Sequence, residues 1–212
     1  MKEFRLATLP LTYLFLLFSL MTFIPGYPIL CGAFFVCLGI FQSYQRNRED
    51  NDILYSVLLS VSKKEVVVAK YIAVVLLQMT AFAICAVCTV VRMTFLSDVR
   101  IYTTNALMGA NFVFLAFVLL IFAAFNIIFV GGFFKTAYGI GKPFVTFIVV
   151  NFLIIGLAET LHHIPGFDWL NVLDFSRFGE HFLILVIAVI VYVASTVVSC
   201  RVSQRRFEKI DL

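Results

Sequence analysis

The chain has 212 residues, of which 62% are hydrophobic and only 13% are charged, and phenylalanine alone occurs 25 times. Soluble domains carry about 25% charged residues, so a soluble protein of this composition would expose large apolar patches to water. The composition therefore excludes a soluble globular domain and indicates an integral membrane protein. The net charge of +4 does not indicate a nucleic-acid partner, because the basic residues cluster at the ends of apolar runs.

Six apolar runs follow one another along the chain, and a helix needs about 20 residues to cross the hydrocarbon core. The runs cover about 6–23, 27–41, 66–91, 107–130, 144–158 and 182–199. The second and fifth are short, but residues 42–44 and 159–161 can extend them. Alternating strand patterning is absent from the runs, so we expect an all-α protein with six transmembrane helices in a single domain, residues 1–212.

Lysine and arginine predict the orientation, since cytoplasmic loops carry an excess of both. With the N-terminus inside, Arg92, Arg100 and Arg177 fall on outer segments and the other 13 of the 16 basic residues fall on inner ones. We therefore expect both termini in the cytoplasm, which an even number of spans allows. The opening MKEFR resembles the start of a signal peptide, but no small-residue cleavage site follows, so we expect a retained first span.

The longest outer loop, residues 159–181, contains all three histidines of the chain. Its apolar residues predict a short helix lying in the outer interface. These residues are Phe167, Leu170, Leu173 and Phe175. Glu159 precedes His162 by three positions, but the loop lacks the H-E-x-x-H pattern of a zinc site, so we expect interfacial histidines and no metal.

The deep parts of the six runs lack acidic and basic residues but contain neutral polar ones. Ion-coupled carriers and proton relays need ionisable groups inside the membrane, so both are disfavoured. Two interpretations of the neutral polar residues stay open: hydrogen bonding between packed helices, or a weakly polar path for amphipathic or lipid-like cargo. The candidates for such a path are Gln78, Thr89, Asn111, Asn126 and Asn151.

Small residues recur at helical spacing on two of the runs. On the third, Ala81, Cys85 and Cys88 share a face with Gln78, and on the second, Gly32 and Gly39 share a face. This spacing favours close helix packing over a redox or metal role for the C-x-x-C pair.

One motif resembles a nucleotide site without being one. The sequence Gly-Ile-Gly-Lys at 139–142 resembles the end of a P-loop, yet Thr136 replaces the first glycine and Pro143 replaces the Ser/Thr. We therefore expect no ATP site and no other cofactor site in this chain.

The first inner loop, residues 42–66, is the most polar part of the chain. It opens with QSYQRNREDND and continues with ILYSVLLSV, whose spacing predicts an amphipathic helix on the inner interface. Ser62 and Glu65 then have the spacing of a capping box, which predicts that the third span begins at Lys63.

The two inner loops carry the resemblance to a known family. LLSVSKKEVVVAKYI resembles the L-P-[VI]-S-R-K-E-I-V-x-[AG]-K-Y motif of small six-span type-2 ABC exporter permeases. FKTAYGIGKPF resembles the F-K-F-G-Y-x-K-x-R pattern that precedes the fifth span in that family. The chain departs from both patterns: Ser60 replaces the proline, Lys63 replaces the arginine, and Thr136 and Ala137 replace Phe-Gly.

The resemblance implies the type-2 permease fold and a half-transporter in the bacterial plasma membrane, exporting amphipathic peptides or lipids. Two permease chains, alike or different, would pair, and each would dock on a separate ABC-type ATPase that holds ATP and Mg²⁺. The ATPase contact would lie on the coupling helix of the first inner loop, with a further contribution from the second inner loop. The residues concerned are Val61, Ser62, Lys63, Lys64, Glu65, Arg46 and Arg48 in the first, and Phe134, Lys135 and Lys142 in the second.

Other functions stay open at this point. The main alternative is a non-transporting sensor or immunity subunit that binds an ATPase or a peptide. A membrane enzyme is less favoured because the runs lack a cluster of catalytic groups. A channel or secondary carrier is disfavoured by the missing ionisable residues.

Overall fold

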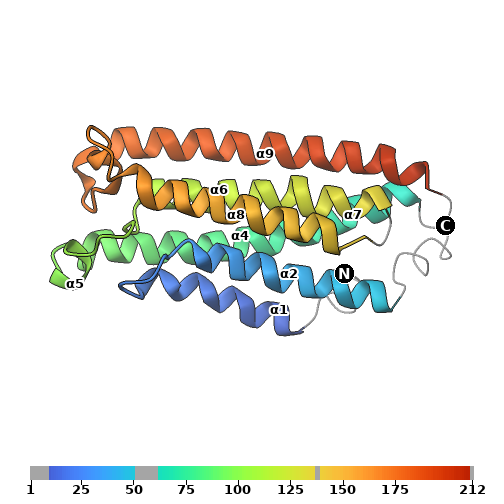
Figure 1. Cartoon of the computed structure of the whole chain (residues 1–212), viewed down its shortest axis with the longest axis horizontal. Coiled ribbons are helices and arrows are strands. Elements are labelled where there is room, and N and C mark those ends of the chain that lie inside the picture. Colours follow the sequence, from blue (N-terminus) through green and yellow to red (C-terminus); the bar gives the residue numbers. More distant parts are fainter. Residues whose placement is uncertain (1–9, 51–61, 137–138, 211–212) are drawn as a thin grey trace.

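The computed structural model describes residues 10–50, 62–136 and 139–210, and every regular element within these ranges is helical. The long helices run side by side along one axis and form an elongated bundle (Figure 1). The α-helices are α1 (Pro10–Phe15), α2 (Cys31–Glu49), α4 (Lys63–Phe95), α5 (Arg100–Thr103), α6 (Phe112–Phe125), α7 (Gly131–Thr136), α8 (Gly141–Leu161) and α9 (Phe178–Glu208). Between them lie 3₁₀ helices η2 (Leu16–Phe23), η4 (Asp168–Asn171) and η5 (Phe175–Arg177), and a π-helical segment, η3 (Asn126–Val130).

Four helical stretches in the described part of the chain are long and apolar enough to cross a membrane. They are Lys63–Phe95, Phe112–Thr136, Gly141–Leu161 and Phe175–Glu208, and they match the third to sixth predicted spans. The first two predicted spans are also helical, but Pro10–Phe23 is shorter and α2 ends in the polar stretch QSYQRNRE. The extensions predicted for the second and fifth runs are confirmed, since α2 continues to Glu49 and α8 to Leu161.

The helix α6 forms the centre of the bundle. In the most apolar part of Phe112–Thr136, the stretch that contains α6, 78% of the residues are buried, against 22% for the stretch that contains α9 and 28% for α8. The neighbours of α6 are chiefly α9 and α8, with α4 and α2 beside them. A helix that is surrounded by other helices has no face in contact with water. This explains the uniformly apolar sequence FVFLAFVLLIFAAF.

The first helical hairpin packs through glycines of α2. A Cβ added at Gly32 would lie 2.6 Å from the carbonyl oxygen of Phe18, and one added at Gly39 would lie 2.5 Å from the Cβ of Phe15. The hydroxyl of Thr12 also donates to the carbonyl oxygen of Gly39 at 2.9 Å. The small-residue packing predicted for the second span is therefore confirmed. The tight turn at Gly26, where φ is +72°, closes this hairpin.

The predicted small-residue face of α4 is also confirmed. Gln78, Ala81, Cys85 and Cys88 are all buried, and α4 packs there against η2 and the central helices. The Cys85 thiol donates to the carbonyl oxygen of Ser19 at 3.9 Å. All five cysteines lie in the described residues as free thiols, as expected of packing residues.

The outer loop contains short helical structure, as expected, but in the form of two 3₁₀ helices, η4 and η5. Gly166 adopts a left-handed φ of +91° before them. The side-chain amide of Asn111 donates to the carbonyl oxygens of Leu170 and Val172, at 2.7 and 3.1 Å. These bonds use backbone acceptors that would otherwise point into solvent, so the loop lies folded over the bundle end with Leu170 buried.

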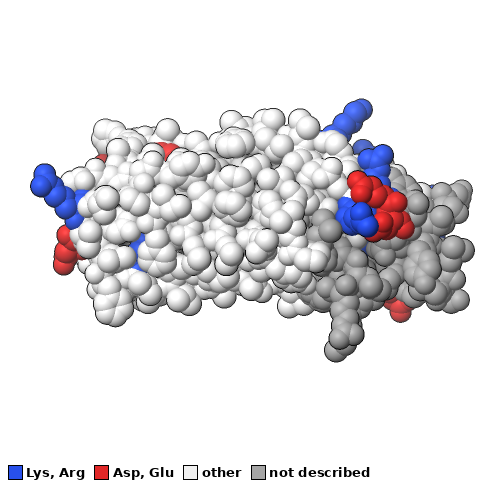
Figure 2. Space-filling model, turned by 90° about the horizontal axis from the view of Figure 1, so that it is seen from below, with Lys and Arg blue, Asp and Glu red and all other residues white. Residues whose placement is uncertain are grey.

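Charged side chains mark the two ends of the bundle. On the face in Figure 2, Lys, Arg, Asp and Glu gather near the ends, and none is visible across the broad central part. We call the end where α4 and α8 begin the Glu65 end, and the opposite end the Trp169 end. A charge-free face between two charged ends is the expected surface of a membrane-spanning bundle.

Candidate functional site

The predicted capping box at the start of α4 is confirmed. The backbone N–H of Glu65 donates to the Ser62 Oγ at 3.3 Å, and the backbone N–H of Ser62 donates to the Glu65 Oε2 at 3.0 Å. The Ser62 hydroxyl also donates to that carboxylate oxygen, at 2.8 Å. Two of the unpaired N–H groups at the helix start are thereby satisfied, so α4 begins at a defined residue, Lys63.

The two lysines that follow the cap join α4 to the end of α9. The Lys63 Nζ donates to the carbonyl oxygen of Ile210 at 2.6 Å, and the Lys64 Nζ lies 3.0 Å from the Glu208 Oε1. The second contact is solvent-exposed and contributes about 0–1 kcal/mol at most. The two contacts matter because they bring together segments that are far apart in the chain. Lys63 and Ile210 are separated by 147 residues.

The other predicted residues of the first inner loop lie in two different settings. Arg46 pairs within its own helix, with its Nε 3.0 Å from the Asp50 Oδ2. Arg48 is exposed at the end of α2 and has no ion-pair partner among the described residues. Val61 and the amphipathic helix predicted before it lie outside the described residues.

The three residues predicted in the second inner loop lie in two different environments. Phe134 is fully buried, and its ring packs edge-on against Phe207 with centroids 5.5 Å apart. Lys135 and Lys142 are exposed, and together with Arg48 they line a pocket of about 570 Å³ at the Glu65 end. The sequence did not indicate this pocket, because its walls come from segments far apart in the chain.

The middle of the bundle holds a buried hydrogen-bond network centred on Asn126, which we call the Asn126 network. Gln78 and Asn126 exchange two amide hydrogen bonds, at 2.9 and 3.0 Å, and Asn126 also donates to the Thr196 hydroxyl at 3.0 Å. The Tyr192 hydroxyl donates to the Gln78 Oε1 at 2.8 Å. The members are Tyr71, Gln78, Asn126, Tyr192, Thr196, Ser199 and Ser203, and all are buried.

The π-helical turn is part of this network. In η3 the regular i to i+4 pattern is interrupted, and the carbonyl oxygen of Asn126 accepts a hydrogen bond from the Ser199 hydroxyl at 2.9 Å. The Tyr71 hydroxyl in turn lies 2.8 Å from the Ser199 Oγ and 3.0 Å from the Ser203 Oγ. The network therefore joins α4, η3 and α9 where the central helix is irregular.

The five candidate cargo-path residues are all fully buried but differ in their partners. Gln78 and Asn126 satisfy one another. Asn111 caps α6, accepting from the N–H of Phe114 at 3.0 Å. The Thr89 hydroxyl and both amide atoms of Asn151 have no hydrogen-bond partner among the described residues. A buried unpaired polar group costs about 1–3 kcal/mol, so these two differ from the other three in having unsatisfied polar atoms.

Two buried cations and the polar face of α9 were missed by sequence reasoning. Lys70 lies within the apolar helix α4, and Arg92 lies in its last turn. Only 1% of the surface of Lys70 and 5% of that of Arg92 is exposed. The Arg92 Nη1 donates to the carbonyl oxygen of Thr22 at 2.6 Å, and the guanidinium lies 4.1 Å from the Tyr102 ring centre. The α9 residues could have been found from their spacing, since Tyr192, Thr196, Ser199 and Ser203 recur at helical intervals.

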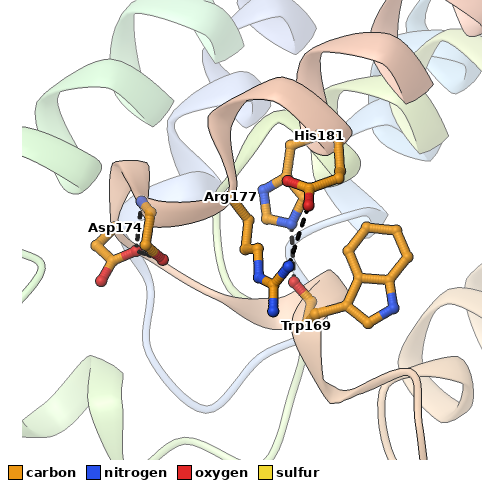
Figure 3. A network of polar contacts seen from close by, with 6 residues as sticks. Trp169, Asp174, Arg177 and His181 are labelled. Carbon is orange, nitrogen blue, oxygen red and sulfur yellow. Dashed lines mark hydrogen bonds and ion pairs between the residues drawn. The ribbon is translucent and has the colours of Figure 1, made fainter.

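The Trp169 end carries a second, partly exposed group of polar contacts (Figure 3). The buried His181 has its Nε2 2.8 Å from the carbonyl oxygen of Trp169, and the two rings stack with centroids 5.9 Å apart. Arg177 pairs with Glu180 at 3.0 Å, and Asp174 accepts from the Ser176 N–H at 2.8 Å. No group of three or more His, Cys, Asp or Glu side chains among the described residues could hold a metal ion.

Comparison with known proteins places this architecture in a family. A family model described as "ABC-2 family transporter protein" matches residues 1–208. Searches of curated proteins and of solved structures return no significant match. The chain therefore belongs to the ABC-2 family, whose members are membrane components of ABC transporters, and the resemblance stated from the two inner loops is confirmed.

Proposed function

We propose that this ABC-2 permease is one half of an ATP-driven exporter, paired in the bacterial plasma membrane with a second permease chain and coupled to a separate ATPase at the Glu65 end. The ATPase subunit holds ATP and Mg²⁺, and the cargo is an amphipathic peptide or a lipid-like molecule. Six helical segments cross the bilayer in this proposal, and the Glu65 end, with both termini, lies in the cytoplasm.

The lengths of the first two segments are compatible with six crossings. The 3₁₀ helix rises about 2.0 Å per residue against about 1.5 Å for an α-helix, so Pro10–Phe23 extends roughly 25 Å. The hydrocarbon core is about 30 Å thick, and the predicted first span begins before Pro10. The second segment, Cys31–Glu49, extends roughly 28 Å over its 19 residues, and its arginines lie at the Glu65 end.

The start of α4 is the observation on which the coupling proposal rests. A 33-residue helix begins there at a capped residue, directly after the loop that the family resemblance identifies as the coupling segment. We expect a force applied at this end to be transmitted along α4, because the helix is continuous over its 33 residues. The contacts of Lys63 and Lys64 with Ile210 and Glu208 extend that force to α9 as well.

Motion of α4 and α9 would act on the centre of the bundle through the Asn126 network. Both helices hold the π-helical turn by hydrogen bonds, through Gln78 from one side and Thr196 and Ser199 from the other. The network stays intact only if η3 moves with both helices. It thus favours a movement in which α4, η3 and α9 shift together.

Cargo contacts in this proposal involve Thr89 and Asn151 rather than Gln78 and Asn126, in a conformation that opens the packing around these two fully buried side chains. The former pair has polar atoms without partners, and the latter pair is saturated. The cargo path itself forms between two permease chains, where exposed apolar faces such as that of α8, with Val149, Phe152 and Leu153, become covered.

The first test is co-purification from native membranes in a mild detergent, followed by mass spectrometry of the proteins recovered. An ABC-type ATPase in stoichiometric amount is expected, and a second six-span chain would indicate a heterodimer. Absence of an ATPase under several mild conditions would overturn the coupling proposal and bring the sensor or immunity function forward.

Variants at the cap separate docking from folding. Glu65→Arg is expected to abolish ATP-driven cargo accumulation in vesicles while the chain still inserts. Glu65→Gln can keep the capping box, because glutamine also serves at this position, and tests the charge alone. Glu180→Arg, the same change at the exposed Trp169 end, is the matched control and should transport normally. Normal transport by Glu65→Arg would contradict the proposed docking surface.

A further inference from the structure

The pocket at the Glu65 end combines positive charge with an apolar wall. Arg48 comes from the end of α2, Lys135 from α7 and Lys142 from the first turn of α8, so three segments each contribute one cation. None of the three has an ion-pair partner within residues 10–50, 62–136 and 139–210. The rest of the wall is apolar or small, including Ile128, Ile140 and Pro143.

The pocket is built by close packing at its base. A Cβ added at Gly132 would lie 2.8 Å from the Cβ of Pro143, so α7 and α8 are in close contact there. Thr146, one turn further along α8, lines the side of the pocket and is exposed on the apolar flank of the bundle. The volume of about 570 Å³ is within the size range of small-molecule sites.

The position of the pocket favours an anionic lipid over a soluble anion. It lies where the apolar helix α8 begins, so in the proposed membrane orientation its cations are at the depth of lipid headgroups and its Thr146 side faces the acyl region. A soluble anion would interact with the three cations but not with the apolar surface beside Thr146. A phospholipid interacts with the cations through its headgroup and with the apolar surface through its acyl chains. Basic pockets between helices on the cytoplasmic side are a recurrent setting for anionic headgroups.

We propose that Arg48, Lys135 and Lys142 form a binding site for the headgroup of an anionic phospholipid, whose acyl chains lie along α8 past Thr146. The three cations meet the phosphate, and the apolar wall accommodates the glycerol backbone. This role replaces the predicted ATPase contact of Arg48 and the two lysines. It rests on the membrane orientation of the proposed function but not on coupling to an ATPase.

The test measures lipid retention by the full-length chain. The protein is purified in a neutral detergent, mixed with equal amounts of phosphatidylglycerol and phosphatidylcholine, and analysed by native mass spectrometry. We expect retained phosphatidylglycerol to exceed phosphatidylcholine. The triple variant Arg48→Gln/Lys135→Gln/Lys142→Gln should lose most of this preference, about fivefold in affinity for each cation removed.

A matched triple variant controls for total charge. Arg201→Gln/Arg205→Gln/Lys209→Gln removes three exposed cations near the same end of α9 and should retain phosphatidylglycerol like the wild type. If the pocket variant fails to fold, Thr146→Phe obstructs the acyl side without changing any charge and should lower retention of the lipid.

Three results would overturn the assignment. Equal preference in the pocket and control variants would mean that the retained lipid binds elsewhere. Displacement of the lipid by inorganic phosphate at comparable concentration would identify a site for free phosphate instead. Loss of the co-purifying ATPase with unchanged lipid preference would identify the three cations as a protein contact.

Discussion

Gln78 and Asn126 form a reciprocal pair of amide hydrogen bonds across the middle of the bundle, each side chain donating to the oxygen of the other at 2.9 and 3.0 Å. Both side chains are fully buried, and the pair joins α4 to the irregular turn of the central helix. Because the partners are complementary, removal of one leaves the other unsatisfied.

We therefore expect Gln78→Leu to lower the free energy of unfolding by about 1–3 kcal/mol, since it leaves the Asn126 amide and the Tyr192 hydroxyl short of a partner. The double variant Gln78→Leu/Asn126→Leu should cost less than the sum of the single variants. Unfolding titrations in mixed micelles measure both quantities. Thr80→Val, on the exposed face of α4, should be nearly neutral, and strict additivity would contradict the pairing.

The glycine contact of the first hairpin gives a second prediction. Gly32→Ala should destabilise the chain by about 1–3 kcal/mol, because the added methyl meets a backbone carbonyl oxygen at 2.6 Å and the helices must separate. Gly156→Ala is the matched control, since that position on α8 is exposed and has nothing within 4 Å. It should be neutral or stabilising by up to about 1 kcal/mol, as expected in a helix interior. Equal thermal stability of the two variants would disprove the contact.

The capping box predicts a local effect. Ser62→Ala should cost about 1 kcal/mol and fray the first turn of α4 without moving its distant end. Hydrogen exchange resolved by peptide should show faster exchange confined to the N–H groups of Glu65 and its neighbours. Ser97→Ala, outside any helix at the other end of α4, serves as control. Unchanged protection at Glu65 would show that the cap does not hold the helix start.

Arg92 links three segments at the Trp169 end. Its guanidinium donates to the carbonyl oxygen of Thr22 and stacks on Tyr102, whose hydroxyl donates to the carbonyl oxygen of Phe23 at 3.0 Å. Arg92→Lys keeps the charge but loses the planar stacking group, so we expect a loss of about 1–3 kcal/mol and faster proteolysis of the turn at Gly26. Arg100→Lys, an exposed change on α5, should have neither effect. Identical behaviour of the two variants would rule out the link.

The turn at Asp174 is expected to depend on pH. Hydrogen bonds from the Ser176 hydroxyl and backbone N–H hold the pKa of the Asp174 carboxyl below its ordinary value. A lowered pKa in the folded state means that the ionised form stabilises the turn. This stabilisation is present above the ordinary pKa and is lost as the pH falls through the lowered one.

The protection factor of the Ser176 N–H, corrected for its intrinsic exchange rate, should therefore fall in that acidic range. Asp174→Asn should remove the pH dependence, and Asp168→Asn, an exposed change in the same loop, should preserve it. A pH profile unchanged in Asp174→Asn would assign the effect to another group.

Local chemistry explains why some features could be predicted. The capping box depends on two residues three apart, and the start of α4 followed from them alone. The glycine face of α2 and the small-residue face of α4 are periodic within one helix, so their burial was also predictable. The two inner-loop motifs are contiguous, and they were sufficient to indicate the family.

Features that combine distant segments were not predictable in this way. The division of the outer-loop helix into two 3₁₀ helices was not predictable, and neither were the hydrogen bonds that this loop accepts from Asn111, nearly 60 residues away. Lys70 was not expected to be buried, since a lysine close to a helix start ordinarily reaches the membrane surface.

The sequence by itself determined the class of protein, the helical runs, the start of α4 and the family, because each depends on composition or on residues near one another in the chain. The tertiary structure decided which polar groups are satisfied, which of the expected cargo residues retain free atoms, and where three cations from α2, α7 and α8 meet in one pocket. The physical reason is that hydrogen bonds and charge clusters depend on distances of a few ångströms between segments, and only the packing of the helices sets those distances.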